Sequence, residues 1–157
     1  MEQKLTHVNY EVDELDKKIL NVLIDNSRLS YRDIAKKVGV SFVTVLKRIQ
    51  RLEKEKIIKS YSTEVDYEKL GYDLSVLVKM RVSHGKSMEV GKKLSTESNI
   101  SSMYNITGDF DDLIFAKFKD RKSMDEFLKK LQGYEQIERT ETSLILNTIR
   151  DKKIKIE

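Results

Sequence analysis

The sequence contains no cysteine and no proline, and only six glycines in 157 residues. Without cysteine the chain can form no disulfide, no thiolate zinc site and no cysteine nucleophile. Without proline, its turns must be made by Gly, Asn, Asp and Ser. No apolar run is long enough to cross a bilayer, and the first ten residues lack the apolar stretch of a signal peptide. We therefore expect a cytoplasmic protein with no membrane partner.

Catalytic motifs are lacking as well. The sequence has no phosphate loop, no G-x-G-x-x-G and no H-E-x-x-H. Neither His7 nor His84 has a neighbouring arrangement of Ser or Asp that suggests a nucleophile system, so both are expected to be surface or structural residues. Asp109, Asp111 and Asp112 are clustered, but a hard cation needs roughly six or more oxygen ligands. We expect no enzyme activity, no metal and no cofactor.

Charge is distributed unevenly along the chain. The whole chain has a net charge of +4, yet residues 30–60 alone contain nine Lys and Arg against three Asp and Glu. From residue 63 to the end the bases and acids balance, at 17 each. The excess positive charge therefore belongs to the N-terminal part, which indicates two domains and a polyanionic partner for the first.

The segment 30–59 predicts two helices joined by a tight turn. Ser30 is a good helix N-cap, Gly39 can end the first helix in the left-handed conformation, and Ser41 can cap the second. Apolar residues recur at helical spacing, so each helix has a face suited to a core. They are Tyr31, Ile34, Ala35 and Val38 in the first helix, and Phe42, Val45, Leu46, Ile49 and Leu52 in the second. With a basic outer face on the second helix, this arrangement is typical of a helix-turn-helix.

Two further elements are predicted beside these helices. An apolar stripe predicts a helix over 14–26, which gives the three helices that enclose a small core. Residues 57–65 are rich in β-branched and aromatic side chains, and they predict a strand or small hairpin. A hairpin at this place is the wing of a winged helix-turn-helix, from which Lys59 can reach a phosphate.

The outer face of the second helix predicts binding to double-stranded DNA. Its first residues are expected to reach base edges and its later ones to meet phosphates, and Val43 can contact a thymine methyl group. A charged helix face is more often simply solvated, but the turn length, the absence of an acid before Glu53 and the local positive charge favour DNA. The predicted DNA-contacting residues are Ser30, Tyr31, Arg32, Lys36, Ser41, Val43, Thr44, Lys47, Arg48, Arg51 and Lys59.

The C-terminal part alternates between strand and helix patterns. Strands are predicted over 74–82, 100–107, 113–119 and 138–149. Helices are predicted over 87–96 and 123–133, begun by Ser87 and Ser123. The order βαββαβ indicates a ferredoxin-like sandwich, a four-stranded antiparallel sheet with both helices on one face. The predicted fold class is therefore α+β, a winged helix-turn-helix followed by this sandwich.

Domain boundaries and oligomeric state follow from this pattern. We expect a DNA-binding domain over 1–65, a linker over 66–73 and the sandwich over 74–157. The sheet face without helices is partly apolar and needs cover, and a homodimer that packs sheet against sheet provides it. Residues 154–157 alternate in polarity and are either an edge strand or a loose end.

Three stretches resemble the Lrp/AsnC, or feast/famine, family of transcription regulators. They are LDKKILNVLIDNSRLSYRDIAKKVGVS (15–41), VLKRIQRLEKEKIIKSY (45–61) and ITGDFDDLI (106–114). The resemblance implies a regulator of transcription that binds palindromic or degenerate AT-rich operator DNA as a dimer, often assembled further into octamers or tetramers, and that acts on the transcription machinery. It also implies an amino-acid effector held at a cleft between subunits, near the loop between the second and third strands of the sandwich. Many members have Ser-Pro at the start of the recognition helix, whereas this chain has Ser41 and Phe42.

The loop between the second and third strands supplies the candidate effector residues Gly108, Asp109 and Asp111. A carboxylate here can meet the ammonium group of a free amino acid, and backbone N–H groups can meet its carboxylate. The alternative is a plain hairpin turn, since Gly-Asp is common turn chemistry. Two other functions are weighed against a regulator: an architectural DNA-binding protein without an effector, and an enzyme on the ferredoxin-like unit, which lacks a convergent set of titratable groups.

Overall fold

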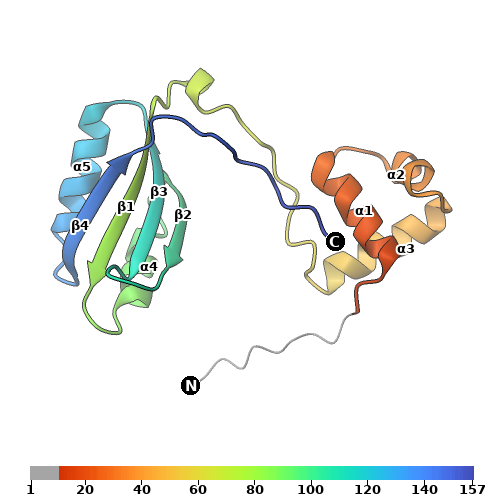
Figure 1. The fold of residues 1–157 in the computed structure, drawn as a ribbon, viewed down its shortest axis with the longest axis horizontal. Coiled ribbons are helices and arrows are strands. Elements are labelled where there is room, and N and C mark those ends of the chain that lie inside the picture. Colours follow the sequence, from red (N-terminus) through yellow and green to blue (C-terminus); the bar gives the residue numbers. More distant parts are fainter. Residues whose placement is uncertain (1–10) are drawn as a thin grey trace. The chain divides into compact units, whose positions relative to one another are not determined.

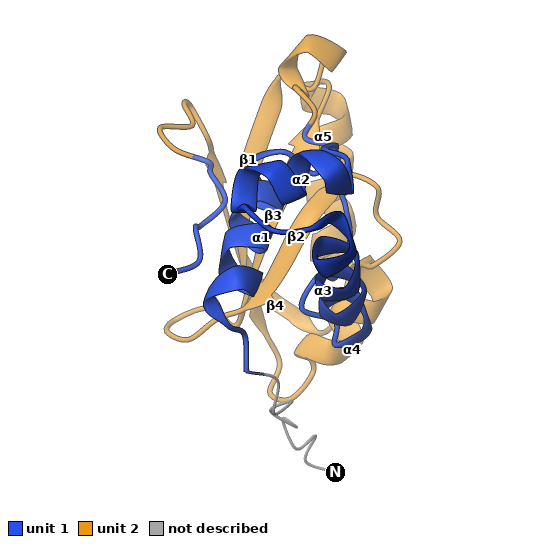
Figure 2. Cartoon of the chain, turned by 90° about the vertical axis from the view of Figure 1, so that its right-hand side faces the viewer, with its two compact units in different colours: residues 1–64, 151–157 blue, residues 65–150 orange. Residues whose placement is uncertain are grey.

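The computed structural model describes residues 11–157, which form two compact units. One unit comprises residues up to 64 together with 151–157, and the other comprises 65–150 (Figure 2). The two units meet between residues 64 and 65, and the last seven residues group with the first unit. His7 lies outside the described residues.

The first unit is built on three helices, α1 (Glu14–Asp25), α2 (Tyr31–Val38) and α3 (Phe42–Lys54) (Figure 1). Their apolar stripes meet in one core, as the helical spacing predicts. The fully buried members come from all three helices, and Leu15, Val22, Tyr31 and Val38 pack against them at its edge. The buried members are Ile19, Leu23, Ile34, Ala35, Val45 and Ile49.

The predicted wing is wrong, because residues 57–66 contain no strand. The β-branched pair at its start is used to close α3 instead: the N–H groups of Ile57 and Ile58 both donate to the carbonyl of Leu52, at 2.9 and 3.1 Å. Lys56 turns the chain there with φ +56°, and Ile58 packs against the helical core. Lys59 is therefore exposed on an extended segment and not on a hairpin.

The second unit is a four-stranded antiparallel sheet covered on one face by two helices. Its strands are β1 (Leu74–Val82), β2 (Ile100–Asn105), β3 (Asp112–Phe118) and β4 (Ile137–Leu144), in the order β2-β3-β1-β4. Its helices are α4 (Ser87–Leu94) and α5 (Arg121–Gln132), and a short 3-10 turn (Glu68–Leu70) precedes β1. Both helices lie on the same face of the sheet (Figure 1). This is the predicted ferredoxin-like topology, and the α+β fold class is confirmed.

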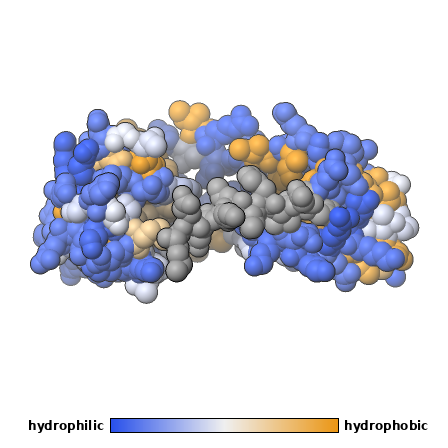
Figure 3. Space-filling view, turned by 90° about the horizontal axis from the view of Figure 1, so that it is seen from below, coloured by the Kyte–Doolittle hydropathy of each residue, from blue (hydrophilic) through white to orange (hydrophobic). Residues whose placement is uncertain are grey.

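The core of this unit lies between the sheet and its helices. Alternate strand residues face it, including Val76, Val78 and Met80 of β1, and Phe127 and Leu131 of α5 meet them. On the opposite sheet face the cross-strand pairs Leu77–Phe115 and Lys79–Leu113 have no helix above them. The view in Figure 3 shows scattered hydrophobic patches on an otherwise hydrophilic surface.

Three local predictions for this unit are wrong. Ser87 does not cap α4, because it is the first helical residue. The cap position is occupied by Lys86, whose side chain makes no capping hydrogen bond. Ser123 does not cap α5 either, because the carboxylate of Asp120 accepts the Ser123 N–H at 2.7 Å. The last strand ends at Leu144, five residues before the predicted 149.

Candidate nucleic-acid interface

The start of α2 and the turn between α2 and α3 are fixed by the three residues that the sequence singles out. Ser30 Oγ accepts the Asp33 N–H at 3.2 Å and donates to the Asp33 carboxylate at 2.6 Å. Gly39 ends α2 with φ +75°, and Ser41 Oγ accepts the Thr44 N–H at 3.1 Å. Each cap satisfies an N–H group at the start of a helix, so α3 begins at a defined place and angle.

One side of α3 is buried and the opposite side is exposed. Val45, Ile49 and Leu52 are fully buried. Val43 is 53% exposed, and Lys47 and Arg51 are exposed too. Thr44 is half-buried and its hydroxyl pairs with Ser41 Oγ at 2.8 Å. The helix therefore presents an apolar residue followed by two bases on its outward side, as the sequence predicts.

The start of α2 adds two aromatic residues and further bases near the first turn of α3. The rings of Tyr31 and Phe42 are 6.4 Å apart, and the Arg32 guanidinium lies 6.0 Å from the centre of the Phe42 ring. Lys36 is exposed one turn further along α2. Phe42, the first residue of α3, therefore lies beside both Arg32 and Tyr31.

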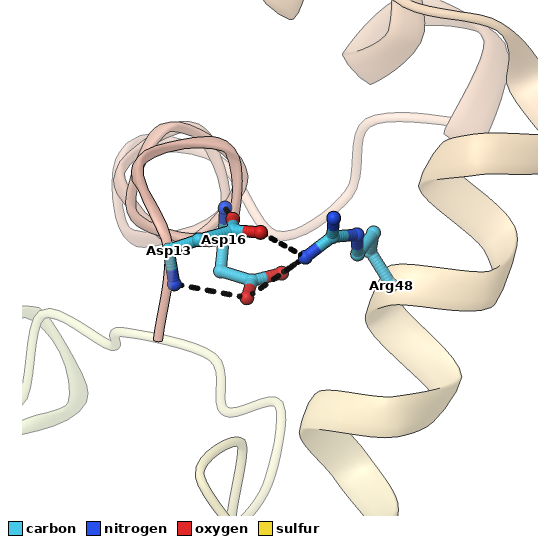
Figure 4. Close-up of polar contacts among 3 residues, drawn as sticks. All are labelled: Asp13, Asp16 and Arg48. Atoms are coloured by element: carbon cyan, nitrogen blue, oxygen red, sulfur yellow. Dashed lines mark hydrogen bonds and ion pairs between the residues drawn. The ribbon is translucent and has the colours of Figure 1, made fainter. Parts of the chain in front are cut away.

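Arg48 is placed differently from its prediction as a DNA contact. Its guanidinium nitrogen bonds the carboxylate of Asp13 at 2.5 Å and that of Asp16 at 3.2 Å (Figure 4). Asp16 is fully buried, so Arg48 provides the positive charge beside a buried acid. The one-residue step from Lys47 turns its side chain about 100° around the helix, toward α1.

The two acids that hold Arg48 also form the start of α1. The Asp13 carboxylate accepts the Asp16 N–H at 2.9 Å, and the Asp16 carboxylate accepts the Asp13 N–H at 3.3 Å, which is a reciprocal capping box. The backbone N–H of Asp16, and then Arg48, lower the pKa of Asp13. One basic residue of α3 therefore joins α3 to the first turn of α1.

Sequence reasoning missed two exposed residues on α3, Gln50 and Lys54. They follow Val43 at i+7 and i+11, so they share its side of the helix. Their spacing from Val43 could therefore have identified them from the sequence. A glutamine amide can bond both edge atoms of an adenine in the major groove.

The candidate effector residues lie in the loop between β2 and β3. Gly108 has φ +112°, the carbonyl of Asp109 accepts from Arg81 Nε at 2.8 Å, and the Asp111 carboxylate accepts the Val82 N–H at 2.8 Å. The loop is thus a hairpin connection held to β1. The cations of Lys79 and Arg139 lie 5.6 and 5.5 Å from the centre of the Phe110 ring in this loop.

Within residues 11–157 no group of three or more His, Cys, Asp or Glu side chains is arranged to hold a metal ion. No helix there has the length and apolar character that a membrane span needs.

Comparison with known families gives two matches that together cover most of the chain. Residues 12–53 match the AsnC-type helix-turn-helix domain. Residues 75–154 match the Lrp/AsnC ligand binding domain. The two matches correspond to the helical part of the first unit and to the sheet-containing unit.

Similar proteins and structures agree with these matches. An uncharacterised HTH-type transcriptional regulator of Pyrococcus furiosus is 36% identical over 141 residues, which is 90% of this chain and 95% of that protein. The structure of Escherichia coli AsnC superposes with a TM-score of 0.86 at 27% identity, covering 94% of this chain and all of that one. A Neisseria meningitidis regulator solved as a complex with L-Met has the same fold, with a TM-score of 0.87, 23% identity and coverage of 94% and 97%. This chain therefore belongs to the Lrp/AsnC family of transcriptional regulators, with an N-terminal helix-turn-helix and a C-terminal ligand-binding domain.

Proposed function

We propose that the exposed side of α3 reads operator DNA, that the protein acts as a homodimer or a larger assembly, and that an amino acid bound by the C-terminal unit modulates it. The observation that carries the DNA-binding part is the two-sided character of α3. Its buried side anchors it to α1 and α2, while Val43, Lys47, Gln50 and Arg51 are exposed together. A recognition helix needs this combination of a fixed inner face and a cationic outer one.

The proposed contacts divide by chemistry. Val43 and Gln50 offer a methyl contact and an amide to base edges, so they are proposed to determine sequence preference. Lys47, Arg51, Arg32, Lys36 and Lys59 offer charge to phosphates. The hydroxyls of Ser30 and Ser41 cap α2 and α3, and the Thr44 hydroxyl pairs with that of Ser41. Tyr31 is proposed to support Phe42, and Arg48 is removed from the set because it pairs with Asp13 and Asp16.

The DNA-binding part is tested by Lys47→Ala in a gel-shift series over salt concentration. Loss of one phosphate contact should weaken binding to all sequences alike and reduce the slope of log K against log salt by about one unit. Lys122→Ala, in α5 of the other unit, is the matched control and should leave the slope unchanged. Footprinting of the wild-type protein should show defined protected sites, and uniform coating of any DNA would contradict sequence-specific regulation.

The homodimer is proposed to form through the sheet face that has no helices. Leu77 and Phe115 are cross-strand partners on this face, and Tyr104 packs edge-on against Phe115 at 6.4 Å. Single apolar side chains on a surface are normal, but a contiguous group on an uncovered sheet face is typical of an interface. Light scattering should show a smaller species for Phe115→Glu and no change for Met88→Glu, which adds the same charge at a residue that is 76% exposed on α4.

The amino-acid effector is proposed for the C-terminal unit, beside Gly108, Asp109 and Asp111. Support comes from the match to a ligand binding domain and from the L-Met complex of the Neisseria protein of the same fold. Operator binding measured with and without each of the twenty amino acids tests this part. Identical affinities throughout would contradict it.

A further inference from the structure

The chain passes between its two units twice, once at residues 64–65 and again at 150–151. A DNA-binding unit on a single linker requires only the first crossing. The second exists because the last seven residues return to the helical unit, whose colour they share in Figure 2. What the second crossing does depends on where each crossing is fixed to the folded parts of the chain.

The first crossing is short and is fixed on both sides by a tyrosine. On the helical side, the Tyr61 hydroxyl donates to the carboxylate of Glu53 in α3 at 2.8 Å. On the other side, the ammonium group of Lys117 in β3 lies 5.5 Å from the centre of the Tyr67 ring. Only residues 62–66 lie between these two tyrosines, so the crossing spans at most about 20 Å.

The second crossing is longer and is fixed only at its ends. The Ile145 N–H, directly after β4, donates to the Ser75 carbonyl of β1 at 2.8 Å. The next hydrogen bonds along the chain are made by Lys155 and Ile156. Residues 146–154 make no hydrogen bond with the described part of the chain, and this crossing spans at most about 35 Å.

The contact at the chain end is specific, although the segment before it is not packed. Ile149, in the middle of that segment, is 99% exposed. The Asn21 side chain donates to the Ile156 carbonyl and accepts the Ile156 N–H, both at 2.9 Å, and Lys155 pairs with Asp25. Ordering an extended segment costs conformational entropy. A segment held only at its far end therefore points to a role in connecting the units.

The two crossings are attached to different helices of the same unit. The first is held at α3 through Glu53, and the second is held at α1 through Asn21 and Asp25. A unit attached at one point can rotate about that point, whereas a second attachment elsewhere on the unit restricts this rotation. Because the tail belongs to the same chain, its effective concentration at α1 is on the order of millimolar, so a few bonds suffice to keep it there.

We propose that residues 151–157 are a second tether that restricts the orientation of the helix-turn-helix, so that the assembled protein accepts operator half-sites at one separation. The inference rests on the proposed binding of operator DNA by a homodimer or a larger assembly. Paired recognition helices read half-sites that lie one turn of DNA apart or a multiple of it, so a restricted orientation selects a spacing. Asn21 is a positioning residue here, because it acts through the tail.

The first test uses the full chain without DNA. Relaxation of ¹⁵N nuclei in NMR gives one rotational correlation time for the amides of α2 and α3, and another for those of β1 and β3. We expect the two values to agree in the wild-type protein. The value for the helices should become shorter in Asn21→Ala, and also in a chain that ends at residue 150.

The matched control for this test is Lys18→Ala, an exposed change on the same helix, which should leave both correlation times unchanged. Circular dichroism checks that each variant is folded, and Asn21→Ala keeps the whole chain. Two different correlation times in the wild-type protein would overturn the proposal. Unchanged values in both tail variants would overturn it as well.

The second test measures tolerance to half-site spacing. A duplex selected from random DNA by the wild-type protein is lengthened at its centre by one, two or three base pairs. Over this series, binding of the wild-type protein should weaken by about tenfold or more, because avidity is lost when geometry prevents simultaneous engagement of both half-sites. Binding of Asn21→Ala should weaken by about threefold or less. An equal loss in the two proteins would overturn the role in spacing.

Failure of this inference is distinguishable from failure of the proposed function. The correlation times report on the tether without DNA, and gel shifts on the original duplex report on DNA binding. If the correlation times respond to the tail but no duplex is bound, the DNA-binding role is wrong and the tether stands. If the duplex is bound but the correlation times do not respond, the tether is wrong and the DNA-binding role stands.

Discussion

At the scale of single residues, the contact between Arg48 and the first turn of α1 has the clearest energetic consequence. Asp16 is fully buried, and the structure gives its carboxylate a guanidinium at 3.2 Å. Removing one partner of such a pair leaves a buried charge without its counter-charge, which destabilises more than the intact pair stabilises. Arg48 is therefore a structural residue, although its sequence position is that of a DNA contact.

Arg48→Met should lower the free energy of unfolding of the N-terminal unit by roughly 1–3 kcal/mol, the range for losing a hydrogen bond to a buried charged group. Methionine keeps most of the side-chain length, so the loss reports the charge. Urea unfolding followed by circular dichroism measures the change. Lys47→Met, one residue earlier on the exposed side, is the control, and an equal effect of both variants would contradict a structural role for Arg48.

The capping acid Asp13 gives a prediction for pH. Its pKa is lowered in the folded chain from the ordinary value of 3.8, mainly by the Asp16 N–H and then by Arg48. A group whose pKa is lower when folded stabilises the fold fully above its unfolded value, and this contribution is lost as pH falls through the folded value. The contribution of Asp13 to the free energy of unfolding should therefore be constant from pH 7 down to about pH 5, and it should decrease below about pH 4. In Asp13→Asn the free energy of unfolding should decrease less steeply over the same pH range. If the variant and the wild-type protein lose stability identically in acid, Asp13 does not contribute to this pH dependence.

The residue scale also shows where sequence reasoning stops. The outward residues of α3 could be predicted, because helical spacing alone separates Val43 and Lys47 from Val45 and Ile49. The role of Arg48 could not, since it depends on Asp13 and Asp16, some 35 residues away, lying beside α3. Asp112 belonged to a visible acidic cluster, but only the strand pairing shows that its side chain faces the helices and not the loop.

At the scale of elements, the helix-turn-helix depends on how α2 ends. Gly39 has φ +75° and nothing lies within 4 Å of the place where a side chain would begin. The need for glycine here is therefore conformational and not steric.

Gly39→Ala should destabilise the N-terminal unit by about 1 kcal/mol, the cost of holding a non-glycine residue in the left-handed region. Gly91→Ala is the matched control and should stabilise the protein, because Gly91 lies within a helix and alanine favours a helix over glycine by up to about 1 kcal/mol. Thermal unfolding of both variants measures the difference. Two variants with the same direction of change would contradict the conformational explanation.

Element boundaries were predicted less well than element types. Gly39 and Ser41 could be placed because a short turn leaves few alternatives, and Ser30 because it directly precedes the apolar stripe of α2. Ser87 and Ser123 were misplaced because a serine within the first turn resembles a cap, and for α5 the cap is Asp120, three residues earlier, whose carboxylate accepts the Ser123 N–H. The prediction of a wing was wrong because β-branched residues after a helix can also bond to the last turn of that helix. Ile57 and Ile58 do so through their N–H groups.

At the scale of the whole molecule, the main unexpected feature is the return of the chain end to the first unit. The side chain of Asn21 on α1 makes two bonds of 2.9 Å with the backbone of Ile156, one as donor and one as acceptor. Lys155 also pairs with Asp25 of the same helix. The sequence of 154–157 left an edge strand and a loose end as alternatives, but the segment binds a helix, and local sequence carries no signal for that.

Removal of residues 151–157 should destabilise α1 by about 1–3 kcal/mol, as expected for two lost hydrogen bonds. Amide hydrogen exchange resolves this by region: α1 should exchange faster, while β1 and β3 should be unchanged. Asn21→Ala removes the same two bonds without shortening the chain and should reproduce most of the effect. Equal exchange of α1 in truncated and full-length protein would show that the tail contact does not stabilise it.

This contact determines what a probe at the chain end can report. Because the chain has no cysteine, Glu157→Cys would create a single thiol for attaching a fluorophore. The dye would lie next to Ile156 and thus beside the middle of α1, in the unit that carries the helix-turn-helix. Its anisotropy would follow operator binding, even though the label sits at the far end of the sequence.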